Sequence, residues 1–130
     1  MLIQSVHAAP LLTSLEQLEW SNRIIVIKPA QNPSLQKEIA QLKQRNAEID
    51  DRDIIWFTLS DKTLVSNYPG KIAAQLQQQL LSLLPKSQAQ VVLIGKDGGI
   101  KDKNNELNLS RIFSLIDQMP MRIAEMNENR

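Results

Sequence analysis

Short apolar runs alternate along the chain with longer segments in which apolar residues recur every three or four positions. The runs lie within 23–28, 54–59 and 91–94 and are rich in isoleucine and valine. Continuous β-branched runs of this length are typical of strands that are covered on both faces of a sheet. The first two therefore predict parallel central strands, and the third predicts a buried strand that leads into a hairpin.

The longer segments place their apolar residues on one face at helical spacing and predict three amphipathic helices. These helices cover 32–46, 72–84 and 109–118. Asn32 and Asn108 are predicted to cap the first and third helices, since asparagine accepts a hydrogen bond from the first helical turn. Pro120 is predicted to end the third, and 121–130 to form a polar, charged tail with room for one more helical turn.

The residues Lys-Asp-Gly-Gly at 96–99 predict a tight turn, because glycine accepts a positive φ without steric cost. The polar stretch 101–106 then predicts an edge strand, and 60–70 predicts a loop. The resulting order is β-α-β-α-β-β-α. It predicts an α/β, thioredoxin-like three-layer sandwich with a mixed four-stranded sheet.

A chain of 130 residues predicts a single domain, which we place at 15–126 with a short tail at 127–130. Residues 1–14 are interpreted as a flexible tail or a signal remnant. Val6-His7-Ala8 resembles a small-residue cleavage site, although no long apolar segment precedes it. The protein is therefore expected to be either periplasmic or secreted, if this signal is used, or otherwise cytoplasmic.

Between this tail and the first strand, the sequence predicts a single helical turn. Ser14 is placed to cap it, with Gln17 three residues later at the position of a capping box. Trp20 follows, and we expect its indole to anchor this entry segment to the core, since a lone tryptophan usually packs.

Composition removes several classes of function. The chain has no cysteine and one histidine, which excludes disulfides, thiolate metal sites and cysteine nucleophiles. The formal net charge is +1 and the basic residues are dispersed along the chain, so we expect no surface that binds nucleic acid. No apolar run approaches the roughly 20 residues of a membrane span. Asp50, Asp51 and Asp53 are interpreted as a solvated loop rather than a metal site.

Three motifs resemble one bacterial family, the domain of unknown function DUF4174. They are Trp20-Ser-Asn-Arg23, Val92-Leu-Ile-Gly-Lys-Asp-Gly-Gly-Ile-Lys101 and Ile116-Asp-Gln-Met-Pro-Met-Arg122. The resemblance extends over nearly the whole chain. It implies a thioredoxin-like fold, related to domains of animal extracellular proteins with sushi repeats, and no established activity. Many members look exported, which favours the signal interpretation of the N-terminus.

The place where a thioredoxin-like redox enzyme carries its thiolate is occupied by residues that cannot replace it. That thiolate follows the first strand at a helix N-terminus, where the dipole lowers its pKa. Here this stretch reads Pro29-Ala30-Gln31-Asn32-Pro33. Disulfide exchange and cysteine peroxidase chemistry are therefore excluded, and the sequence singles out no catalytic residue.

Charged residues within the family motifs remain as candidates for binding, namely Arg23, Lys96, Asp97 and Arg122. A structural interpretation is that the arginines pair with Asp97 or Asp117 and tie the ends of the chain to the sheet. A functional interpretation joins these residues to Pro29, Gln31 and Asn32 in a site for an anion or a peptide carboxylate beside the first helix.

Two hypotheses of function follow. The first is a non-catalytic module that binds a protein or peptide partner, or serves the cell envelope, through an apolar groove over 29–33. The second is a non-thiol enzyme or an anion-binding protein that uses a cleft at the same helix, with Arg23 or Lys96 holding the ligand. A degenerate relative of a redox enzyme is a third possibility. None of these needs a cofactor or a metal.

Overall fold

The structure, a computed structural model, describes residues 9–28, 32–60, 63–84 and 90–128. Its centre is a five-stranded sheet in the order β3-β2-β1-β4-β5. The strands are β1 (Arg23–Ile27), β2 (Ile54–Leu59), β3 (Leu64–Ser66), β4 (Val91–Ile94) and β5 (Ile100–Asn104). Only β1 and β2 pair in parallel, and the remaining neighbours are antiparallel.

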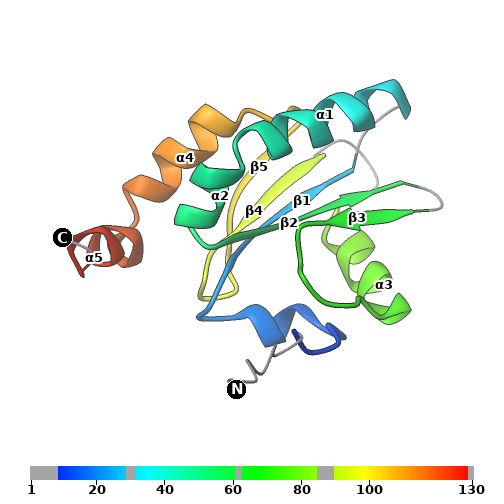
Figure 1. The fold of residues 1–130 in the computed structure, drawn as a ribbon, viewed down its shortest axis with the longest axis horizontal. Helices are drawn as coiled ribbons and strands as arrows, with labels where there is room; N and C mark the ends of the chain where they lie inside the picture. The colour runs from blue at the N-terminus through cyan, green and yellow to red at the C-terminus, as the bar shows by residue number, and fades with distance from the viewer. Residues whose placement is uncertain (1–8, 29–31, 61–62, 85–89, 129–130) are drawn as a thin grey trace, which may run out of the picture.

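Helices cover both faces of this sheet (Figure 1). The helical elements are η1 (Leu15–Leu18), α1 (Asn32–Gln44), α2 (Asn46–Asp51), α3 (Ala74–Leu83), α4 (Leu109–Asp117) and α5 (Pro120–Glu128). One core joins α1, α2 and α4 to one face, and a second core joins η1 and α3 to the other. The α/β class and the three-layer arrangement with a mixed sheet are thereby confirmed.

The sheet has one strand more than the sequence analysis predicted. The segment 60–70, predicted to be a loop, contains β3, which pairs with β2 through Phe57, Thr58 and Leu59. Three residues are too few to give an alternation pattern, so the strand is defined by its partner and not by its own sequence. The prediction of four strands was therefore wrong.

Two helices also differ from the prediction. The first predicted helix, 32–46, matches α1, but a second short helix, α2, follows it and includes Asp50 and Asp51, which were interpreted as part of a solvated loop. Pro120 does not only end α4, because it also begins α5, a nine-residue helix where a tail was predicted. Proline suits this place since the first helical residue needs no N–H donor and has a φ close to that of proline.

The entry segment packs differently from the expectation. Leu12 is fully buried and pairs with Ile72 across an isolated bridge, so part of the predicted tail contributes to the core. The single helical turn at η1 is confirmed. Trp20, in contrast, is 64% exposed with a φ of 68°, and the prediction that it anchors this segment was wrong. Residues 1–8, with the proposed cleavage site, lie outside the described residues.

The topology brings several segments to one end of the sheet. Arg23 begins β1, Asp53 precedes the parallel β2, and Lys96 follows the antiparallel β4. In Figure 1 the red helix α5 and the yellow turn between β4 and β5 lie toward this end, while α1 starts at the other. In the part of the chain described, no helix has the length and apolar character to cross a bilayer.

Candidate functional site

Charged side chains gather at this end of the sheet around Arg23, which is only 1% exposed. Its Nη1 and Nη2 donate to the two carboxylate oxygens of Glu125 on α5, both at 3.1 Å. Nη1 also donates to the carbonyl oxygen of Arg52 at 2.9 Å. This paired geometry fixes α5 against the start of β1, because two parallel bonds specify orientation as well as distance.

Lys96 enters the same cluster from the β4–β5 turn. Its Nζ donates to Glu125 at 2.8 Å and to Asp53 at 2.9 Å. Partial burial alone would raise the pKa of Glu125, but the hydrogen bonds from Arg23 and Lys96 outweigh it and lower that pKa. Glu125 is therefore ionised at neutral pH, and together with Asp53 it balances the charges of Arg23 and Lys96.

Arg122 forms the second half of the cluster. Its Nε donates to Asp117 at 3.1 Å and its Nη2 to Asp51 at 2.6 Å. Arg52 forms a paired contact with the same Asp117 carboxylate and stacks on the ring of Phe113, 4.5 Å from its centroid. The predicted pair of Arg122 and Asp117 is thus confirmed, whereas Arg23 pairs with a residue that the sequence did not suggest.

The cluster is balanced in charge, since each of its cations has a carboxylate within 3.1 Å. It is also far from the start of the first helix, because Arg23 and Lys28 flank β1 and about five residues of strand separate them by roughly 16 Å. The functional interpretation combined both ends into one site, and this topology separates them. Pro29 and Gln31 lie outside the described residues, as does the side chain of Asn32.

One donor of this cluster has no partner among the described residues, the Nε of Arg23. Arg23 and Lys96 also line a pocket of about 270 Å³ beside the start of α5. Its remaining wall consists of the β4–β5 turn and the apolar residues 119–121. Asp97 and Lys101 lie on its rim and pair with each other at 2.8 Å.

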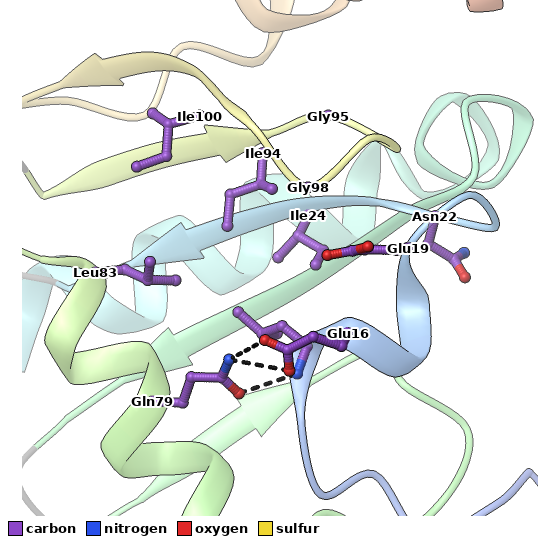
Figure 2. A pocket seen from close by; sticks show the side chains of 11 residues that line it. Glu16, Glu19, Asn22, Ile24, Gln79, Leu83, Ile94, Gly95, Gly98 and Ile100 are labelled. Carbon is purple, nitrogen blue, oxygen red and sulfur yellow. Dashed lines mark hydrogen bonds between the residues drawn. The ribbon is translucent and has the colours of Figure 1, made fainter.

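A second cavity lies on the other side of the β4–β5 turn, between η1, α3 and the hairpin (Figure 2). We name it the acidic groove. Its volume is about 170 Å³. The residues that line it are Leu15, Glu16, Glu19, Asn22, Ile24, Gln79, Leu83, Ile94, Gly95, Gly98 and Ile100. They form an apolar floor with two carboxylates beside it, and the described residues contribute no lysine or arginine to this lining.

Gln79 fixes the position of one of these carboxylates. Its side-chain oxygen accepts from the backbone N–H of Leu15 at 3.0 Å, and its Nε2 donates to Glu16 at 2.9 Å (Figure 2). A hydrogen bond from its own backbone N–H lowers the pKa of Glu16 against slight desolvation, and bonds from Ser14 and Gln79 add to this. Glu16 is therefore ionised and oriented from α3.

Glu19 lies against the β4–β5 turn. A Cβ atom built on Gly98 would be 2.7 Å from the Oε1 atom of Glu19, and Gly98 has a φ of 84°. Glycine is favoured here by the positive φ of the turn, and the lack of a side chain leaves room for the carboxylate. Figure 2 shows Glu19 extending over Ile24 at the apolar floor.

The sequence analysis missed the residues of this groove. It named neither Gln79 nor the two glutamates Glu16 and Glu19 as candidates. Glu16 and Glu19 lie more than fifty positions before α3 and the hairpin in sequence, and the packing of η1 brings them together. In the described ranges, no three acidic or histidine residues are placed to hold a metal ion.

Comparisons with known proteins agree with this fold. The model of a family described as Domain of unknown function (DUF4174) matches residues 14–125. No curated protein matches the sequence. A crystal structure of the reduced 2-Cys peroxiredoxin of Plasmodium vivax superposes with a TM-score of 0.54 at 13% identity, over 89% of this chain and 85% of that one. At this identity the likeness concerns the thioredoxin-like fold alone.

Proposed function

The chain belongs to the DUF4174 family, and from this premise we propose that it is a non-catalytic module that binds a peptide segment of a partner protein, for example in the cell envelope. The acidic groove is the observation that carries this proposal. It combines an apolar floor, a polar rim and a position beside the edge strand β5. The thioredoxin-like fold supplies the scaffold, and the absence of cysteine excludes the thiol chemistry of redox enzymes with that fold.

The size of the groove supports a peptide rather than a small-molecule substrate. Its volume of about 170 Å³ lies below the range of roughly 300–1,000 Å³ that is usual for small-molecule sites. A single side chain fills such a space, and the rest of a peptide then lies across the neighbouring surface. Ile100, which is 45% exposed on β5, provides apolar surface next to the groove.

The experiment is a titration of the ¹⁵N-labelled protein with short peptides, followed by amide chemical shifts. We expect shifts at Leu15, Ile24 and Ile94, and weaker binding in Ile100→Ser. Leu81→Ser is the matched control, because Leu81 is exposed to a similar extent, 43%, on α3 but does not line the groove. Saturable shifts confined to other surfaces would exclude the groove as the peptide site.

Anion binding is the second candidate, and the pocket beside α5 favours it. The orphaned Nε of Arg23 and the first turn of α5, which has no acidic side chain, both suit an anion. Against it, Arg23 and Lys96 already hold carboxylates. A thermal-shift screen with phosphate and acetate tests this candidate: a saturable rise in Tm that Lys101→Ala abolishes would support it, and a flat response would exclude it.

A further inference from the structure

We infer that the acidic groove accepts a lysine or arginine side chain, presented by an otherwise apolar segment of the partner. This inference rests on the proposed function and adds the chemistry of the bound segment. Its basis is the combination of an apolar floor with two carboxylates that pair with no lysine or arginine among the described residues.

The carboxylates of the groove differ from the other acidic groups packed near them. Glu125, Asp53 and Asp97 each have a lysine or arginine within 3.1 Å. Glu16 and Glu19 form no salt bridge with any residue in the described part of the chain, and Glu16 receives only neutral donors. The negative potential of the groove is therefore left for a ligand to neutralise.

One of the two carboxylates, that of Glu16, is held in position before any ligand arrives. Gln79 orients Glu16 through its amide, and the turn at Gly98 leaves space for Glu19. A glutamate that is already oriented loses less side-chain entropy on binding than a freely rotating one would. This orientation of the carboxylate makes the groove a specific acceptor for a cationic side chain.

The apolar floor selects the kind of cation. Lysine and arginine carry their charge on an aliphatic stem, which prefers apolar surface while the charged head remains at the rim. Leu15, Ile24 and Leu83 would contact the stem, and Glu16 and Glu19 the head. An acidic side chain would be repelled, and a purely apolar one would desolvate the carboxylates without compensation.

The test compares three blocked pentapeptides, Gly-Leu-Lys-Ile-Gly and the same sequence with Gln or Glu in place of Lys, by amide shift titration. We expect the Lys peptide to bind most tightly, the Gln peptide less tightly and the Glu peptide least. The Kd values of the Lys and Gln peptides should differ by about two- to fivefold, which is the effect of one exposed ion pair. Glu19→Gln should weaken the Lys peptide by a similar factor and leave the Gln peptide unchanged. Glu128→Gln, an exposed carboxylate on α5, is the control.

Ionic strength gives a second readout. Raising NaCl from about 20 to about 500 mM should remove most of the difference between the Lys and Gln peptides, because the Debye length falls well below 10 Å. Equal affinity of the three peptides at the groove would overturn the inference and leave the proposed peptide site standing. Absence of binding by all three, with the protein folded, would contradict the proposed function itself.

Discussion

On the two sides of the β4–β5 turn, the protein places carboxylates in contrasting surroundings, and Gly95 lines the cavity on each side. Toward α5, Glu125 and Asp53 neutralise buried cations. Toward α3, Glu16 and Glu19 face an apolar floor that carries no cation. A charge with an internal partner contributes to folding, because removing it leaves the partner uncompensated. A charge without one is available for binding, so the two regions should respond differently to substitution.

The largest expected effect is the loss of Arg23. Arg23→Ala should lower the free energy of unfolding by about 3 kcal/mol or more, because it leaves Glu125 and the Arg52 carbonyl without their buried partner. Urea denaturation measures this change. Arg111→Ala is the matched control, since Arg111 makes a similar paired contact with Asp102 at the surface and its loss should cost much less. Equal losses in the two variants would contradict a structural role for the cluster.

Acid should weaken the same cluster through Glu125. Its pKa in the native state is lowered below the ordinary value of 4.5, so its stabilising contribution is present above about pH 4.5. That contribution is lost as the pH falls through the lowered native pKa. In urea denaturation at a series of pH values, wild type and Glu125→Gln should therefore differ most near neutrality and converge in acid. If the difference in free energy of unfolding between wild type and Glu125→Gln is the same at every pH, the charge of Glu125 does not contribute to stability.

Gly98 connects the turn to the groove. Gly98→Ala should cost about 1–2 kcal/mol, since alanine is strained at a φ of 84° and its Cβ would approach the Oε1 atom of Glu19. Gly99→Ala should cost less, because its φ is not in the left-handed region and its nearest contact is 3.3 Å. Thermal unfolding of the two variants gives the comparison, and a greater loss in Gly99→Ala would refute this account of the turn.

The smallest effect on stability is expected in the acidic groove. Glu19→Gln should change the free energy of unfolding by less than about 0.5 kcal/mol, because Glu19 is exposed and forms no salt bridge with the described residues. Urea denaturation under the conditions used for Arg23→Ala makes the contrast direct. If Glu19→Gln lowers the free energy of unfolding as much as Arg23→Ala does, the groove stabilises the fold. The proposed difference between a stabilising cluster and a binding groove would then be wrong.

The features that the sequence predicted are those with a strong local signal. The buried runs that form β1, β2 and β4 are too short to be interpreted as helices. The Asp97-Gly98 pair specifies a turn by itself. The cap at Asn108 was equally local, and its side chain accepts from the N–H of Arg111. Such elements are determined within a few residues.

The features that it missed depend on contacts between distant segments. Arg122 and Glu125 are three residues apart and hence lie on one face of α5. The sequence analysis took Pro120 as the end of a helix and therefore did not predict α5. The partner of Arg23 could not be named without that helix. Likewise, Glu16 acquires its place only when Gln79, 63 residues later, packs against η1. Local patterns therefore predicted the scaffold, and tertiary packing built both charged regions.

The most direct test of the account is a reversal of charge in the acidic groove. The double variant Glu16→Lys/Glu19→Lys, confirmed as folded by circular dichroism, is titrated with the Lys and Glu pentapeptides. The account predicts that the preference reverses, so that the Glu peptide binds more tightly than the Lys peptide. An unchanged preference for the Lys peptide would contradict the claim that these two carboxylates select the partner.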